Sequence, residues 1–324
     1  MSMNIANIEI KPKRQGYAHL ADKFGEDRPF SRYEEAVFGA QPSENFHYRP
    51  QWDVDHEIFD VTRTKIVMKD WEDLIDPRKF HYMTYVSTRS KQNSTSVDNM
   101  EFLEKRMLLS KMSSEDIDII KKYVTPLRHY FYGANMNNLT LASIGYGGPF
   151  VSAAQFQAED ELGFAQHVTK IILNLTNNDE FALETGKDAW LNCSEWQGLR
   201  KAVEDSFVVK DYMELFVIQN AIFDAFIIPL MFKSLPEKLT PAGNLAMGMM
   251  SEFILTVTDE TNKWVDSIIK VCAKESSENK ELLTAWTNKY LNITVDALSP
   301  LDKDTVSSIK EDVVARLKKS GLNI

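Results

Sequence analysis

Two glutamates lie on long apolar helical stripes, at positions where a carboxylate is unexpected. Read in alternating steps of four and three residues, the segment 151–175 gives one stripe in which Glu161 is the only acid. The segment 246–271 gives a second stripe whose only acid is Glu260. Steps of this kind mark the inward face of a bundle helix. Inward carboxylates on facing helices are the groups that proteins use to hold a dinuclear iron centre.

Such a centre also needs histidines, and the sequence lacks them at the required positions. Each of two helices must supply a Glu-x-x-His pair, since residues three apart project toward the same metals. Phe164 stands three residues after Glu161, and a phenyl ring has no lone pair to give. Lys263 stands three residues after Glu260, and its ammonium repels a cation. We therefore predict that this chain binds no metal or other cofactor and has no catalytic residue, with four vestigial positions: Glu161, Phe164, Glu260 and Lys263.

The inward acids need other partners if they are buried. An unpaired carboxylate in an apolar core is costly and tends to take up a proton. We expect a cation to replace the metal, and the candidates are Lys263, Arg128 and His129. The alternative for either acid is an ordinary solvated glutamate, because the phase of a stripe drifts along a long helix.

Two matches to the metal-binding spacing occur elsewhere, in the pairs Glu44/His47 and Asp53/His56. Both lie in a proline-punctuated segment, where residues three apart need not converge. They are also close together in sequence rather than on two separate long helices. We interpret them as coincidental. The chain shows no motif for a catalytic nucleophile.

Composition and charge limit the remaining function classes. The 324 residues are 44% hydrophobic and 26% charged, which is ordinary for a soluble globular chain. The formal net charge of −10 argues against nucleic acid or an anionic membrane as the main partner. Cys193 and Cys272, the two cysteines, form no close-spaced pair. No apolar signal segment opens the chain, so a cytoplasmic protein is expected.

From residue 96 onward the apolar pattern predicts helices and no strands, which indicates an all-α fold. A helix opening at Asp76-Pro77 is expected before that, and a break at Pro126. The apolar run 209–235 is read as a buried helix with a kink near Pro229, because its polar residues argue against a membrane span. A long helix capped by Thr240, one over 280–297 and a last amphipathic one complete the pattern.

Residues 1–60 read differently, as an extended arm rather than a domain. Prolines interrupt the arm repeatedly, and no long helical period survives between them. Between Tyr17 and Phe59 it carries nine aromatic residues, which cannot form an independent core. We expect these rings to be buried against other subunits, since aromatic residues are favoured at interface centres.

Several motifs in the N-terminal part carry a resemblance to a known family. They are the stretches 45–53 (NFHYRPQWD), 60–66 (DVTRTKI), 70–71 (DW), 76–82 (DPRKFHY) and 85–89 (YVSTR). These stretches resemble the β subunit of bacterial multicomponent phenol hydroxylases, and Glu161 and Glu260 fit the same family. The resemblance covers nearly the whole chain. It implies a single ferritin-like, ribonucleotide-reductase-like bundle over 61–324 that follows the arm.

The resemblance also implies a role inside an assembly. Such hydroxylases are (αβγ)₂ hexamers in which the di-iron centre of the α subunit hydroxylates phenol with O₂. A reductase supplies electrons from NADH, and a small regulatory protein gates the reaction. The β subunit is structural: it contacts α, γ and the second β subunit. The residues expected at interfaces are Tyr48, Arg49, Trp52, Arg63 and Trp71.

Three other functions stay open at this point. The sister toluene, alkene and methane monooxygenases have β subunits of similar design. A self-sufficient ferritin-like metalloprotein would need iron to co-purify with this chain alone. A helical binding protein would need a sizeable apolar cavity near Glu161 and Glu260.

Overall fold

The computed structural model describes residues 19–25, 28–41 and 48–324, and within these ranges all regular secondary structure is helical. The all-α prediction is therefore confirmed. The main helices are α3 (Tyr82–Lys105), α4 (Ser114–Val124), α5 (Leu127–Ile144), α6 (Gly148–Leu175), α7 (Phe181–Asn192), α8 (Ser194–Ser206), α9 (Tyr212–Phe216), α10 (Asp224–Pro229), α11 (Pro241–Glu275) and α12 (Ser277–Lys319).

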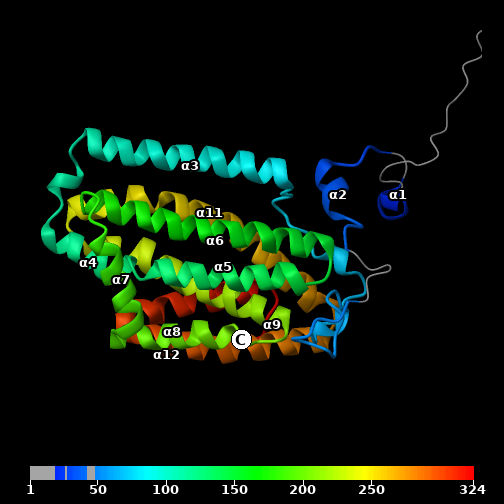
Figure 1. Cartoon of the computed structure of the whole chain (residues 1–324). Coiled ribbons are helices and arrows are strands. Elements are labelled where there is room, and N and C mark those ends of the chain that lie inside the picture. Colours follow the sequence, from blue (N-terminus) through cyan, green and yellow to red (C-terminus); the bar gives the residue numbers. More distant parts are fainter. Residues whose placement is uncertain (1–18, 26–27, 42–47) are drawn as a thin grey trace, which may run out of the picture.

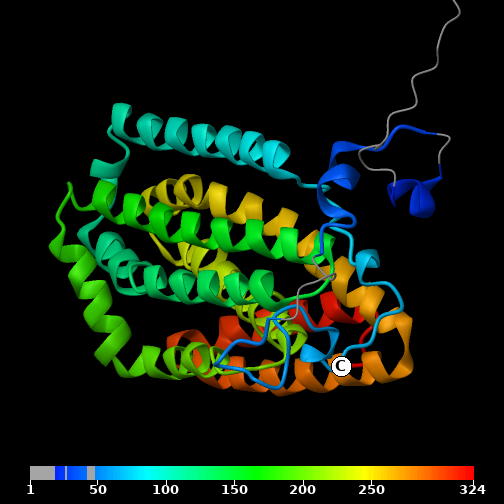
Figure 2. The same ribbon diagram turned by 45° about the vertical axis from the view of Figure 1, so that its right-hand side comes forward.

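Long helices lie side by side to form the bundle (Figure 1). α5 and α6 pack along their lengths, α11 lies behind α6, and α3 covers the α6 and α11 side. α8 and α12 form the opposite side of the molecule, as Figure 2 also shows. One large apolar cluster fills the space between them, and Trp196 and Trp264 are among its fully buried side chains.

Several predicted helix boundaries are confirmed. Pro126 separates α4 from α5, because it has no N–H to continue the first helix. Thr240 caps α11, with its side chain accepting a hydrogen bond from the N–H of Gly243 at 3.3 Å. The last two predicted helices form α12, which has non-helical backbone at Asp302, two residues after Pro300.

The predicted start of α3 is wrong by about five residues. The Asp76 carboxylate accepts hydrogen bonds from both the N–H and Nε of Arg78, each at 2.9 Å. This closes a local turn, and Lys79 then has a φ of 52°, in the left-handed region. A helix cannot pass through that conformation, so α3 begins only at Tyr82.

The apolar run contains two π-helical segments, Val217–Phe223 and Leu230–Ser234. The second segment begins directly after Pro229, the position of the predicted kink: the N–H of Leu235 donates to the carbonyl of Leu230, five residues back, at 3.0 Å. Residues 212–238 are long and apolar enough to cross a membrane by length and composition. Their most apolar window is 94% buried inside the protein, as in a core helix.

The described part of the arm is not extended throughout. It forms α1 (His19–Phe24) and α2 (Arg32–Val37), the latter started by a Ser31/Glu34 capping box. The two helices share a small apolar cluster: Leu20, Tyr33, Val37 and Phe38, with Phe24, Phe30 and Ile75 against it. The expectation that these rings form no core of their own is therefore wrong for this stretch, because two short helices suffice to bring them together. The domain boundary at residue 60 stays a prediction.

Candidate functional site

Glu161 is fully buried in the centre of the bundle, as its stripe predicts. Its Oε1 accepts a hydrogen bond at 2.7 Å from Gln157, one turn earlier on α6. The Gln157 side-chain oxygen accepts in turn from the hydroxyl of Thr261 on α11, at 2.8 Å. The donor to Glu161 is thus a neutral amide and not the expected cation.

Asp224, at the start of α10, is the second acid of this core. Its Oδ1 accepts from the Tyr130 hydroxyl of α5 at 2.6 Å and from the Gln219 amide at 2.8 Å. Gln219 lies in the first π-helical segment, and its own oxygen accepts from Asn137 at 2.8 Å. α5 and the first π-helical segment therefore hold the Asp224 carboxyl group in place.

Burial alters the acidity of both groups. It raises the pKa of Glu161 well above its usual range, and the charge of the neighbouring Asp224 raises it further. Burial also raises the pKa of Asp224, although hydrogen bonds from Tyr130 and Gln219 oppose the shift. Both shifts favour the protonated form of these acids.

Glu260 occupies a different environment, at the edge of the bundle. Its carboxylate accepts from Arg89 of α3 at 2.5 Å and from Gln92 at 2.7 Å. A quarter of its side chain remains exposed. The prediction of a cationic partner is right for Glu260, but the cation is Arg89 and not Lys263, Arg128 or His129, because α3 lies across this face of α11.

Arg89 also binds Asp160, the residue before Glu161. Its Nε and Nη2 contact the two carboxylate oxygens at 2.7 and 2.8 Å, and the Tyr85 hydroxyl donates to the same carboxylate at 2.9 Å. The guanidinium lies 5.1 Å from the ring centroid of Phe80 and 5.6 Å from that of Tyr85. α3 is thereby joined to α6 and α11 through one side chain.

The two positions where a metal site would need histidines are filled in other ways. Phe164 is buried between Phe131 and Phe253, with ring centroids 5.4 and 6.0 Å away. Lys263 lies on the exposed face of α11.

A di-iron centre does not fit these residues. The core offers two carboxyl groups, Glu161 and Asp224, surrounded by amides and a phenol. In the part of the chain that the structure describes, no three residues of the types His, Cys, Asp and Glu are grouped so as to hold a metal ion. Glu44 and His47 lie outside the described residues. His56 contacts Asp53 at 3.1 Å, and Arg63 holds the same carboxylate at 2.6 Å.

The five predicted interface residues fall into two groups. Tyr48, Arg49 and Trp52 lie at the surface, and the exposed fractions of the two aromatic residues are 59% and 67%. Arg63 and Trp71 are buried inside this chain. Trp71 packs against Tyr146 and Tyr212, with ring centroids about 6 Å apart.

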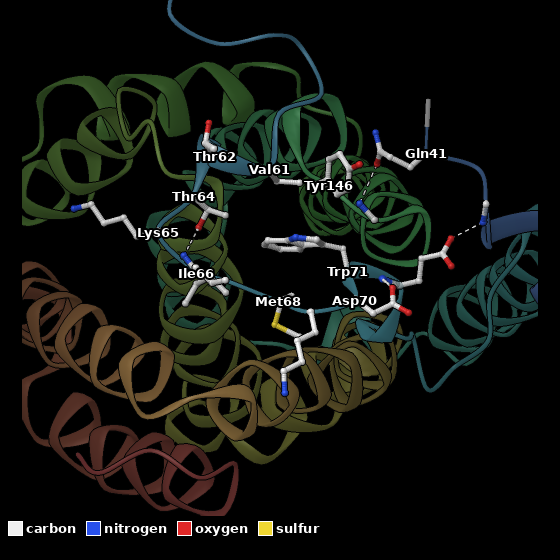
Figure 3. A pocket seen from close by; sticks show the side chains of 15 residues that line it. Gln41, Val61, Thr62, Thr64, Lys65, Ile66, Met68, Asp70, Trp71 and Tyr146 are labelled. Atoms are coloured by element: carbon white, nitrogen blue, oxygen red, sulfur yellow. Dashed lines mark hydrogen bonds between the residues drawn. The ribbon is translucent and has the colours of Figure 1, made fainter. Parts of the chain in front are cut away.

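Trp71 lies beside an open groove of about 970 Å³ at one end of the bundle (Figure 3). The extended segment 64–69 forms part of its wall. Side chains behind this segment hold its backbone: Asp211, Asn279 and Glu275 accept from the N–H groups of Lys65, Val67 and Lys69. Neither Glu161 nor Glu260 lines this groove or any of four smaller pockets in the described part of the chain.

Sequence reasoning missed Asp224 and the pairing role of Arg89. Asp224 stands in an apolar run, where it served only as an argument against a membrane span. The π-helical segment before Asp224 interrupts the regular helical period, so the sequence does not show which face of its helix Asp224 occupies. Arg89 closes one of the family motifs, but nothing in the spacing indicates which acids it reaches.

Known proteins are similar to this chain in sequence and in fold. Residues 52–276 match the family model of the Methane/Phenol/Alkene Hydroxylases. The chain belongs to this hydroxylase family. It is 37% identical over 99% of its length to an oxygenase component of phenol 2-monooxygenase from Pseudomonas sp. (strain CF600), covering 98% of that protein. A second such component, from Acinetobacter pittii (strain PHEA-2), is 35% identical with the same coverage of both chains.

More distant hydroxylases are similar as well. The chain is 21% identical, over 68% of each protein, to the hydroxylase component subunit beta of the toluene-4-monooxygenase system of Ectopseudomonas mendocina. Among solved structures, phenol hydroxylase from Pseudomonas sp. OX1 superposes with a TM-score of 0.90 at 35% identity, over 98% of each chain. Toluene 4-monooxygenase superposes at 0.79 with 18% identity, over 93% of this chain and 100% of that one, which shows the shared fold.

Proposed function

We propose that this hydroxylase-family chain is the non-catalytic β subunit of a multicomponent phenol hydroxylase. Its role is to support, within an (αβγ)₂ complex, a catalytic α subunit that holds the di-iron centre. That α subunit hydroxylates phenol with O₂ and electrons that a reductase takes from NADH. The other proposed partners are a γ subunit, the second β subunit and a regulatory protein, all in the cytoplasm.

The observation that carries this proposal is the side-chain content of the bundle core. The chain has the helices of a hydroxylase but lacks histidines at two positions where a di-iron site needs them. At one position Phe164 packs in an aromatic cluster, and at the other Lys263 lies on the exposed face of α11. Neutral amides and a phenol hold the carboxyl groups that remain. This core lacks histidines at the two positions that a di-iron centre requires, which supports placing the oxygen activation in a partner subunit.

The relatives support the same assignment. Two of them are named as oxygenase components of phenol 2-monooxygenase and match end to end, and a more distant one is named as a hydroxylase subunit beta. Phenol is the favoured substrate because these phenol relatives are 35–37% identical, against 21% for the toluene system. A β subunit of a toluene or alkene monooxygenase is the alternative within the family.

The surface of the arm indicates where a partner would bind. Tyr48 and Trp52 expose large apolar side chains, and Arg49 lies between them in sequence. Aromatic and arginine side chains contribute most of the binding energy at many interfaces. We therefore place the contact with the catalytic subunit on Tyr48, Arg49 and Trp52. Arg63 supports that surface, because its guanidinium lies 5.4 Å from the ring centroid of Trp52. Trp71 is buried elsewhere, against Tyr146 and Tyr212.

Co-expression with the partner subunits tests the proposal. The full chain, purified alone, is expected to contain no stoichiometric iron and to hydroxylate neither phenol nor toluene. The same chain within the assembled oxygenase component, with reductase and NADH, is expected to support turnover, faster on phenol. Stoichiometric iron in the isolated chain would contradict the non-catalytic assignment. Faster turnover of toluene would favour the sister systems.

A further inference from the structure

Glu161 and Asp224 form a cluster of buried titratable groups that the proposed function does not use. Both carboxyl groups are buried, with exposed fractions of 0% and 6%. Each has one oxygen that is fully accounted for: Oε1 of Glu161 accepts from Gln157, and Oδ1 of Asp224 accepts from Tyr130 and Gln219.

The remaining oxygens have no donor around them. Oε2 of Glu161 and Oδ2 of Asp224 are buried and receive no hydrogen bond from any N–H or hydroxyl group in the described structure. The two carboxyl groups are hydrogen-bonding neighbours of each other. Two buried carboxylate oxygens in contact would repel, and a proton between them removes the repulsion and satisfies both.

We infer that Glu161 and Asp224 share one proton, which Glu161 carries on Oε2 and donates to Oδ2 of Asp224. The direction follows from the other contacts. Asp224 accepts two further hydrogen bonds on Oδ1, as an ionised carboxylate does. Glu161 accepts one, from Gln157, as the carbonyl oxygen of a neutral acid does.

The surrounding charges agree with a single negative charge on the pair. Asp160 of α6 is neutralised by Arg89, and Tyr130 of α5 is a neutral donor. From α12, the partly buried Arg316 attracts Asp224 electrostatically. Arg316 also lies 3.0 Å from Asp266 of α11. Thr261, the α11 residue linked through Gln157, is uncharged. The proton therefore takes the charge-balancing place that a metal ion holds in a carboxylate-rich bundle core.

This assignment gives the protein a pH-dependent core. The pKa of Glu161 is raised in the folded state, because burial and the Asp224 charge both disfavour its ionisation. The folded state then binds one proton more than the unfolded chain, in which a glutamate titrates near pH 4.3. The stabilisation is fully present below that value and is lost as the pH rises. Between about pH 4.3 and the raised pKa of Glu161 in the folded state, the unfolding constant increases by up to about tenfold per pH unit.

Infrared spectroscopy of the full chain tests the proton directly. At pH 7 we expect the carbonyl stretch of a protonated carboxylic acid, shifted by ¹³C-labelling of glutamate and not by labelling of aspartate. Glu161→Gln imitates the neutral acid, since its amide can donate to Asp224, and is expected to abolish the band. Glu159→Gln is the matched control, because Glu159 lies exposed on the same helix and its removal should leave the band unchanged.

Chemical denaturation between pH 5 and 9 gives a second readout. The unfolding constant of Glu161→Gln, divided by that of the wild type, is expected to fall as the pH rises, whereas Glu159→Gln should show a constant ratio. If Glu161→Gln fails to fold, Asp224→Asn replaces it and should retain a glutamic-acid band at a changed frequency. Absence of the band in the wild type, or a band that shifts with aspartate labelling, would overturn the assignment.

Discussion

Arg89 of α3 and Asp160 of α6 form a two-pronged ion pair, with N–O distances of 2.7 and 2.8 Å, inside the bundle. The same guanidinium reaches Glu260 of α11. Its pKa is raised further above its usual range, because the hydrogen bonds to both acids outweigh the opposing effect of burial. Arg89 therefore stays charged and holds three helices together.

Arg89→Ala should be among the most destabilising single changes. It leaves Asp160 buried without its cation, and breaking a buried pair in this way costs about 3–5 kcal/mol. The free energy of unfolding, measured by chemical denaturation, checks this value. Arg106→Ala, at the exposed end of the same helix, should change it by less than about 0.5 kcal/mol. Equal effects of the two variants would contradict the role of Arg89.

Glu260→Ala should cost clearly less than Arg89→Ala. The side chain of Glu260 is one-quarter exposed, and Arg89 keeps Asp160 as its partner when Glu260 is removed. We expect a loss of about 1 kcal/mol, in the range of partly solvated ion pairs. Measuring Glu260→Ala, Asp160→Asn and the double variant in one series would separate the two contributions. A loss for Glu260→Ala equal to that for Arg89→Ala would show that Glu260 is the main partner.

Two glycines of α6 should respond to alanine in opposite ways. A Cβ at Gly148 would lie 1.9 Å from the backbone carbonyl of Val37, so α2 would have to move. Gly148→Ala should destabilise by about 1–3 kcal/mol and expose the arm to protease. At Gly163 a Cβ meets nothing within 4 Å, and Gly163→Ala should stabilise by up to about 1 kcal/mol. Unchanged proteolysis of Gly148→Ala would show that α2 is not held there.

The two cysteines should differ in reactivity. Burial raises the pKa of the Cys272 thiol to about 12, and the charge of Glu275 adds to the shift. Cys193 is only partly buried. Alkylation at pH 8 followed by mass spectrometry should modify Cys193 and spare Cys272 in the folded chain, because the thiolate is the reactive form. After denaturation both should react. Modification of Cys272 before unfolding would show that this core opens.

Trp52→Ala should separate assembly from folding. Trp52 is exposed in this chain, so its loss should change the free energy of unfolding by less than about 0.5 kcal/mol. Association with the catalytic subunit, measured by co-purification, should weaken. Phe181→Ala, which removes another exposed ring at the start of α7, is the control and should leave that association unchanged. Full assembly of Trp52→Ala would contradict the proposed arm interface.

The periodic parts of the sequence predicted the fold well. The stripes through Glu161 and Glu260 gave α6 and α11, and Pro126 and Thr240 gave correct boundaries, because spacing and capping act locally. The start of α3 and the two arm helices depended on contacts that spacing does not encode, such as the turn at Asp76. Asp224 lies on another helix, α10, and only tertiary packing determines which face of that helix meets Glu161.

The π-helical segment Val217–Phe223 bears on how Asp224 is recognised in related chains. A π-helical turn holds an extra residue, and each α-helical residue turns the chain by about 100°. Shortening this segment by one residue would therefore rotate Asp224 by about 100° relative to the residues before the segment. Two sequences that differ by a single gap here can thus align almost perfectly and still place different residues in the core. Equivalent positions in this helix are assigned reliably only by superposition in space.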